Sequence, residues 1–181
     1  MKRCKWVNLN NPIYVAYHDH EWAVPSYDDR YLFEMLVLET FQAGLSWECI
    51  LNKRESFRSC LDNFDYYKIS KYDEEKIQEL LSNKNIIRNK LKIKSMIKNA
   101  KIFIDITKEY GSFSNYIWHF TNNKIIKNNT NNIPTHNELS DKISADLYKR
   151  GMRFVGTIII YSYLEAIGII NDHELTCSKH Q

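Results

Sequence analysis

The stretch KRGMRFVGTIIIYS, residues 149–162, carries the clearest indication of the fold. Gly151 and Gly156 bracket a short turn, with Val155 expected to be buried between them. Glycines let a backbone approach a phosphate, and a helix that follows such a turn offers its N-terminal amides to the anion. With Arg153 beside it, the stretch is typical of a helical hairpin that contacts DNA. An ordinary corner between two helices, with glycine as the C-cap, is the alternative.

The rest of the chain also indicates helices. Glycine (five) and proline (three) are scarce, and apolar residues recur at steps of three and four. Helices are expected from Asp28 or Asp29 to Phe41, from Ser46 through Leu61, after an N-cap at Asp73, from Asn89 to Tyr110, from Ser112 to Phe120, from Glu138 to Arg150, and from about Gly156 to Ile167. Residues 121–137, TNNKIIKNNTNNIPTHN, are expected to form a surface loop. No alternating run indicates a sheet, so we expect an all-α fold.

The bulk composition is that of a folded protein. The chain has 181 residues, of which 44% are hydrophobic and 13% aromatic, and we expect one domain over residues 1–181, with a helical hairpin near 138–169. No apolar run reaches the length of a membrane span, and the first residues lack the apolar stretch of a signal peptide. A soluble, cytoplasmic, monomeric protein is expected. Its four cysteines are then reduced thiols or metal ligands, and Cys49 and Cys60, eleven apart on one helix face, are expected in the core.

The charges are unevenly distributed although the formal net charge is only +3. Seven basic residues and no acid lie between Lys84 and Lys101. Such a run is either a solvated helix face or a surface that faces phosphates, and the sequence leaves both interpretations open.

Two pairs of metal-ligand residues stand at opposite ends of the chain. Cys4 and His18 lie near the start, while His173 and Cys177, four residues apart, can point the same way from one helical turn. Two cysteines and two histidines suit a closed, tetrahedral, structural zinc site that joins the termini. Unrelated thiols and surface histidines are the alternative. Nearby histidines expected outside the site are His20 and His180.

An acid and an aromatic residue flank a glycine turn in ETFQAGLSW, residues 39–47. Residues 44–48 begin like a nucleophile elbow, G-x-S-x-G, but Glu48 stands where the second glycine of that motif belongs. The hydrolase motif is therefore excluded. The other early aromatic residues are Trp6, Tyr14, Tyr17 and Trp22. Core packing explains most such residues, but with Glu39 they could form a box for a flat, electron-poor ring.

Five motifs together resemble one family. RCKWV (3–7), PIYVAYHDHEW (12–22), LETFQAGLSW (38–47), GMRFVGT (151–157) and NDHELTC (171–177) are similar, in order and spacing, to the type I 3-methyladenine DNA glycosylases of bacteria. The resemblance runs from Met1 to about Lys179. It implies a helix-hairpin-helix DNA repair fold with structural Zn²⁺, and a monofunctional enzyme that hydrolyses the N-glycosidic bond of 3-methyladenine in double-stranded alkylated DNA.

The resemblance also implies roles for single residues. The zinc ligands would be Cys4, His18, His173 and Cys177; the base pocket would consist of Trp6, Tyr14, Tyr17, Glu39 and Trp47; and the DNA contacts would be Gly44, Leu45, Gly151, Arg153, Gly156 and Thr157. Glu39 would be the catalytic residue, and its carboxyl group is expected to be ionised at neutral pH. Leu45 would be an apolar wedge that occupies the gap left by the extruded base.

Several features qualify this interpretation. The family usually has glycine at Ala23 and a polar residue at Phe41, which leaves the shape of the pocket open. Asp172 is expected in a turn or behind a metal ligand, with a catalytic role as the alternative. No lysine is placed to form a Schiff base, so strand cleavage is not expected.

The rival hypothesis is a non-catalytic DNA-binding module that is held together by zinc and recognises distorted duplex DNA. The predicted buried Glu39 argues against it, because a protein that only binds phosphates gains nothing from a buried carboxylate.

Overall fold

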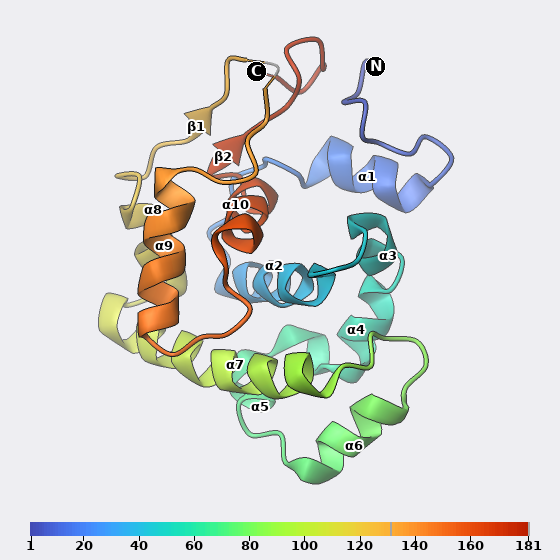
Figure 1. The fold of residues 1–181 in the computed structure, drawn as a ribbon, viewed down its shortest axis with the longest axis vertical. Coiled ribbons are helices and arrows are strands. Elements are labelled where there is room, and N and C mark those ends of the chain that lie inside the picture. Colours follow the sequence, from blue (N-terminus) through green and yellow to red (C-terminus); the bar gives the residue numbers. More distant parts are fainter. Residues whose placement is uncertain (131, 181) are drawn as a thin grey trace.

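The computed structural model describes residues 1–130 and 132–180, and its elements are shown in Figure 1. Asn131, in the predicted loop, and Gln181, at the end of the predicted domain, lie outside the described residues. The helices are α1 (Pro12–His20), α2 (Asp29–Gln42), α3 (Trp47–Leu51), α4 (Arg54–Cys60), α5 (Tyr66–Ile69), α6 (Glu74–Ser82), α7 (Lys90–Tyr110), α8 (Phe113–His119), α9 (Glu138–Lys149) and α10 (Thr157–Ala166). A 3₁₀ turn, η1 (Asp62–Phe64), and two short strands, β1 (Ile126–Lys127) and β2 (Ile170–Asn171), complete the order.

Local capping explains several helix boundaries. The side chains of Asp28, Asp73, Asn89 and Ser112 accept hydrogen bonds from main-chain N–H groups in the first turns of α2, α6, α7 and α8. Gly111 ends α7 with a φ of 83°, a conformation that glycine adopts without a steric penalty. These helices therefore form where the sequence predicts them.

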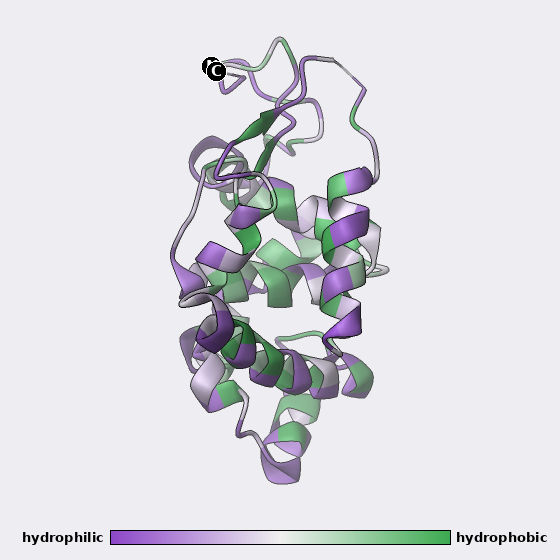
Figure 2. Cartoon of the chain, turned by 90° about the vertical axis from the view of Figure 1, so that its left-hand side faces the viewer, coloured by the Kyte–Doolittle hydropathy of each residue, from purple (hydrophilic) through white to green (hydrophobic). Residues whose placement is uncertain are grey.

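Helix α2 crosses the centre of the molecule and positions the site. All its residues from Leu32 to Phe41 are buried, which is possible only because other helices cover it on every side. Helices α7, α8 and α10 contact it, and Figure 2 shows hydrophobic ribbon at the centre and hydrophilic ribbon on the outside. The C-terminal end of α2 carries Glu39, so the core fixes this acid in place.

The region after α2 differs from the prediction of one helix from Ser46 through Leu61. The chain breaks at Asn52 and Lys53 into α3 and α4, and the break lets buried Arg54 reach Glu34 on α2, with Nε 2.7 Å from Oε1. The prediction that Cys49 and Cys60 share one helix face in the core is wrong, because they lie on different helices and are only half-buried. Helix α1, which begins after an Asn11 N-cap, was not predicted.

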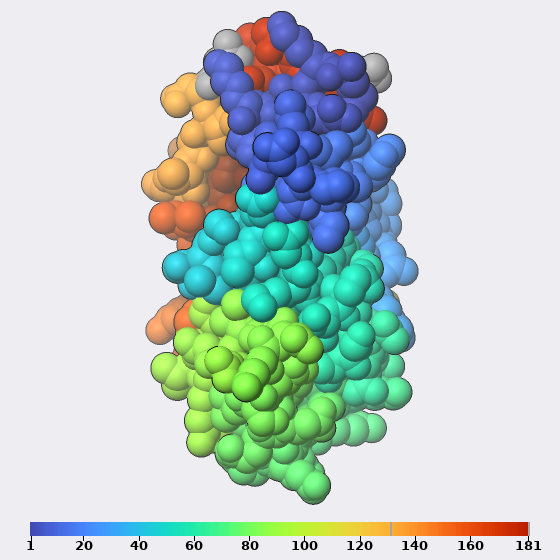
Figure 3. Space-filling model, turned by 90° about the vertical axis from the view of Figure 1, so that its right-hand side faces the viewer, coloured from blue at the N-terminus to red at the C-terminus, as the bar shows by residue number. Residues whose placement is uncertain are grey.

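The two ends of the chain lie together at one end of the molecule. The Ser178 N–H donates to the Lys2 carbonyl oxygen at 2.8 Å, and Figure 3 shows red C-terminal atoms among blue N-terminal ones. Nearby, β1 and β2 pair in parallel over two residues, so the all-α expectation misses this small pairing. Among the described helices, none is both long and apolar enough to cross a membrane.

Candidate functional site

The four predicted metal ligands converge where the termini meet. The ligand atoms of Cys4, His18, His173 and Cys177 all lie within 4.8 Å of one another, and the four residues are buried. The His173 Nδ1 atom is 3.4 Å from the Cys4 Sγ and 3.5 Å from the Cys177 Sγ. The cluster could hold a metal ion. His20 and His180 are not members of it, as expected.

Groups around the cluster suit metal ligation. Burial raises the pKa of the Cys4 thiol to about 12, so a bound cation is needed to hold it as a thiolate. The Glu174 N–H donates to the Cys4 Sγ at 3.4 Å and stabilises negative charge on that sulfur. Asp19 accepts a hydrogen bond from the His18 Nδ1 at 2.8 Å and therefore leaves Nε2 to face the cluster. Burial lowers the pKa of His173 to about 4, so its imidazole is neutral at pH 7, the form that binds a metal.

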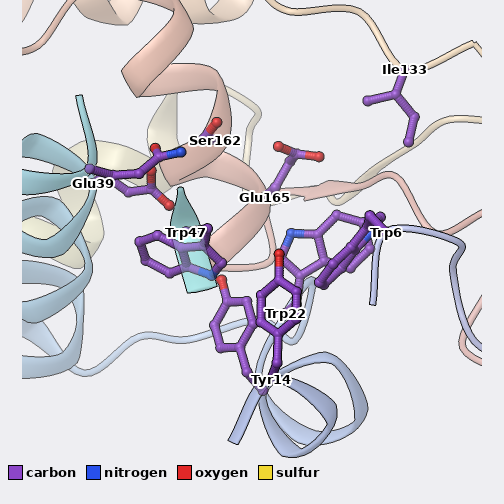
Figure 4. Close-up of a pocket in the computed structure, with 10 residues that line it drawn as sticks. Trp6, Tyr14, Trp22, Glu39, Trp47, Ile133, Ser162 and Glu165 are labelled. Atoms are coloured by element: carbon purple, nitrogen blue, oxygen red, sulfur yellow. The ribbon is translucent and has the colours of Figure 1, made fainter. Parts of the chain in front are cut away.

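A cavity of about 200 Å³ opens between α1, α2, α3 and α10. Its lining includes all five predicted pocket residues, which are Trp6, Tyr14, Tyr17, Glu39 and Trp47. Trp6 packs edge-on against Tyr14, with ring centroids 5.2 Å apart, and Tyr17 is 5.4 Å from Trp47. Figure 4 shows Trp47 and Trp6 on different sides of the cavity. Flat aromatic walls of this kind can hold a flat ring by stacking.

Two buried polar atoms in this cavity have no hydrogen-bond partner among the described residues. They are Oε2 of Glu39 and Nε1 of Trp47. A buried acceptor and a buried donor each cost free energy unless paired, so both atoms call for a ligand with a polar edge. Because burial raises the pKa of Glu39 to about 8, its carboxyl group in the protein alone is mostly protonated at pH 7. The expectation of an ionised Glu39 is wrong in that state, and a cationic ligand is needed to ionise it.

Five further residues line the cavity, which are Trp22, Gln42, Ile133, Ser162 and Glu165. Of these, the sequence suggested only Trp22. Trp22 belongs to the early aromatic set, and its ring centroid is 4.9 Å from that of Trp6. Glu165 is an acid within an apolar helix, which was the available signal that this position is special.

The loop after α2 joins two residues that line this cavity, Gln42 and Trp47. Gly44 has a φ of 82°, and the Leu45 N–H donates to the Gln42 carbonyl oxygen, so the loop is a tight turn. The Leu45 side chain is 40% exposed and is therefore free to contact a partner. The buried Lys92 ammonium holds the turn by donating to the carbonyl oxygens of Phe41 at 2.8 Å and Ala43 at 2.7 Å.

The predicted hairpin is present between α9 and α10. Gly151 has a φ of 102°, and Val155 is buried as predicted. Gly156 is the N-cap of α10 and offers no side chain to the first amides of that helix, while Thr157 bonds through its Oγ1 to Asp141. An ideal Cβ at Gly156 would meet nothing within 4 Å, so the surface in front of these amides is open.

Positive charge near the hairpin is smaller than the sequence suggests. Arg150 is paired with Asp146 and Glu109 at 2.7 and 2.6 Å, so its charge is balanced. Arg153 lies with its guanidinium carbon 4.9 Å from the Tyr148 ring centroid. The basic run from Lys84 to Lys101 is only partly balanced. Lys92 is buried, and Lys90 and Lys94 are paired with Glu74. Lys98 lies beside Gly151, and the other basic residues of the run, Lys84, Arg88 and Lys101, are exposed.

The two departures from the family pattern differ in their consequences. Phe41 is buried against Phe57 at 5.0 Å between ring centroids and does not line the cavity. Ala23 has a φ of 61°, a region that favours glycine, and its N–H donates to the Glu165 carbonyl oxygen at 2.9 Å. Asp172 is also outside the cavity lining; it accepts a hydrogen bond from Tyr161 at 2.5 Å.

Comparison with known proteins is consistent with this geometry. The model of the methyladenine glycosylase family matches residues 6–180. DNA-3-methyladenine glycosylase 1 of Escherichia coli (strain K12) is 42% identical over 180 residues, which cover 98% of this chain and 96% of that protein. A crystal structure of 3-methyladenine DNA glycosylase I superimposes with a TM-score of 0.95 at 42% identity, covering 99% of this chain and 100% of that one. A variant of 3-methyladenine DNA glycosylase I in complex with 3-methyladenine gives a TM-score of 0.95 at 30% identity, covering 100% and 98%.

Proposed function

The chain belongs to the methyladenine glycosylase family, and on that premise we propose that it is a monofunctional DNA glycosylase that excises 3-methyladenine from alkylated double-stranded DNA. The observation that carries the proposal is that two buried polar atoms of one aromatic cavity, Glu39 Oε2 and Trp47 Nε1, have no hydrogen-bond partner among the described residues. An extruded purine offers a flat face to the rings and a polar edge to these atoms. We place the protein, as a monomer, in the cytoplasm.

The substrate is labile before the enzyme acts. Adenine methylated at N3 is cationic in DNA, so its bond to deoxyribose is weakened, and neutral base leaves when that bond breaks. As the cationic base binds, Glu39 releases its proton to solvent and accepts a hydrogen bond from the base, while Trp47 covers the face of the ring. Water then adds to the sugar at C1′ and loses a proton to solvent, giving an abasic site. The protein contributes by extrusion, orientation and charge recognition.

Two surfaces would hold the DNA. The open N-terminal amides of α10 at Gly156 and Thr157 suit a backbone phosphate, with Gly151 and Arg153 beside them. Exposed Leu45, on the turn after Gly44, is placed to fill the gap that the extruded base leaves in the duplex. This arrangement makes the α9–α10 hairpin a helix-hairpin-helix element.

Zinc is the metal that best fits the cluster of Cys4, His18, His173 and Cys177. Zinc bonds of about 2.3 Å to sulfur and 2.0–2.1 Å to nitrogen, at tetrahedral angles, place sulfur and nitrogen about 3.5 Å apart. The observed Sγ to imidazole nitrogen distances are 3.4–3.5 Å. Four protein ligands leave no position for water, so the metal would stabilise the junction of the termini and take no part in the reaction.

The test is product identification. Duplex DNA treated with a methylating agent is incubated with the protein, and the released bases are separated by chromatography. We expect free 3-methyladenine, and strands that stay intact until alkali cleaves the abasic sites. Binding without release of any base would show a non-catalytic DNA-binding module instead, and direct strand cleavage would contradict a monofunctional enzyme.

A further inference from the structure

A second buried acid, Glu165, faces the base cavity from α10. It is 9% exposed and lines the same cavity as Glu39 on α2. Figure 4 shows the Glu165 carboxyl group set apart from that of Glu39, which lies beside Trp47. The excision scheme above uses Glu39 alone, so Glu165 has no role in it.

The protein supplies no positive charge to balance this acid. None of the described residues that line the cavity is a lysine or an arginine. The charged neighbour of the Glu165 carboxyl is Asp172, itself an acid, which accepts a hydrogen bond from the Tyr161 hydroxyl at 2.5 Å. Burial, followed by Asp172 and Glu39, raises the pKa of Glu165 well above its usual range. Ionising either acid in this cavity costs free energy, and a cation bound inside the cavity lowers that cost.

We propose that Glu165 is a second specificity-determining residue of the base pocket, which accepts a hydrogen bond from the exocyclic amino N–H of the cationic methylated base that Glu39 leaves free. This inference rests on the proposed function. A methylated adenine in DNA carries a delocalised positive charge, so two acids can interact with it from different directions. Neutral adenine gains no such charge interaction, and its exclusion therefore depends on both acids.

The surroundings of Glu165 restrict its movement. The residue is buried on α10, and its carbonyl oxygen accepts from the Ala23 N–H at 2.9 Å. Its neighbour Asp172 is held in turn by the Tyr161 hydroxyl at 2.5 Å. A buried side chain on a fixed main chain loses little conformational freedom when the base binds.

A pair of small ligands tests the inference without DNA. In 3,9-dimethyladeninium a methyl group replaces the sugar and the ring stays cationic, whereas 9-methyladenine is its neutral counterpart. Calorimetric titration of the wild type and Glu165→Gln gives the ratio of the two dissociation constants. We expect the wild type to prefer the cation, and Glu165→Gln to lower that preference about tenfold, as for the loss of one charge-assisted hydrogen bond, with 9-methyladenine binding changed less than about twofold. Glu75→Gln, which removes an exposed acid on α6, controls for net charge and should keep the wild-type ratio.

Three further outcomes decide the inference about Glu165. An unchanged ratio in folded Glu165→Gln would overturn the inference, even if excision slowed, because the acid would then act on the sugar or on the fold. If Glu165→Gln does not fold, carbon NMR of the wild-type Glu165 carboxyl serves instead; a resonance that moves on addition of 3,9-dimethyladeninium supports the contact, and a static one refutes it. A wild type that prefers the cation but releases no 3-methyladenine from DNA would refute the proposed function and leave this ligand contact standing.

Discussion

The side-chain amide of Asn99 makes two hydrogen bonds with the main chain of Arg153. Asn99 Nδ2 donates to the Arg153 carbonyl oxygen and Asn99 Oδ1 accepts from the Arg153 N–H, each at 2.9 Å. Asn99 is buried on α7, and Arg153 lies in the turn between α9 and α10. This pair therefore fixes the hairpin turn on the long helix behind it.

Asn99→Ala should loosen the hairpin without touching the base pocket. Two main-chain groups lose their partners, a loss of about 1–3 kcal/mol in the free energy of unfolding. We expect weaker binding to damaged and undamaged duplexes alike, with unchanged binding of free 3-methyladenine. Fluorescence anisotropy with both duplexes measures this. A folded variant with wild-type DNA affinity would show that the hairpin does not need this anchor.

Gly156→Asp separates charge from shape at the start of α10. The φ of −60° suits any residue, and an added Cβ meets nothing within 4 Å, so the variant should fold and the new carboxylate should cap α10. The same carboxylate repels a phosphate, and we expect at least about tenfold weaker DNA binding at low salt. Gly156→Asn caps the helix without charge and should lose much less affinity. Equal losses for the two variants would indicate a steric effect.

Removal of one cluster ligand should reduce metal content and stability together. Cys177→Ser should copurify with less zinc and melt at a lower temperature, because a metal that binds only the folded state stabilises it. Cys60→Ser changes a half-buried thiol outside the cluster and should retain the metal. Metal analysis beside thermal unfolding gives both numbers. A Cys177→Ser protein with full zinc content would remove Cys177 from the ligand set.

Glu39 should make stability fall as pH rises. Burial raises the pKa of Glu39 from 4.5 to about 8, so the folded protein holds this proton more tightly than the unfolded chain. The contribution is complete below the unfolded value and is lost as pH rises through the folded one. Between about pH 4.5 and pH 8 the wild type should lose up to a few kcal/mol of unfolding free energy relative to Glu39→Gln, and little more at higher pH. Parallel denaturant curves for the two proteins would contradict the raised pKa.

Local sequence signals predicted much of the fold. The N-cap at Asp73 and the glycine stop at Gly111 act within one helical turn, so neighbouring residues suffice to locate them. The break at Lys53 depends on Arg54 reaching Glu34, twenty residues earlier. Gly168 was also missed as a constrained position, although an added Cβ there would lie 2.3 Å from main-chain atoms of Val24. Contacts between distant segments leave no mark in a local pattern.

In the site, too, some residues could be predicted from the sequence and others depend on contacts between distant segments. Residue type and the four-residue spacing of His173 and Cys177 suggested that Cys4 and Cys177 are ligands, the family resemblance implied it, and the structure brings these residues together. The apolar residues around Glu165 mark it as an unusual position, but they do not indicate which cavity it lines, because that depends on how α10 packs. Only the packing of α10 against α2 turns it toward Glu39 and makes the cavity an acidic one.

The most direct measurement is the affinity of the wild type and Glu39→Gln for cationic 3,9-dimethyladeninium and for neutral 9-methyladenine. Glu39→Gln keeps the shape of the side chain but cannot ionise. The account predicts that the cation binds about tenfold to a hundredfold more weakly to the variant, the range for one charge-assisted hydrogen bond, whereas the weak binding of 9-methyladenine changes little. If Glu39→Gln binds the cation as tightly as the wild type does, Glu39 is a structural acid and the proposed basis of selectivity is wrong.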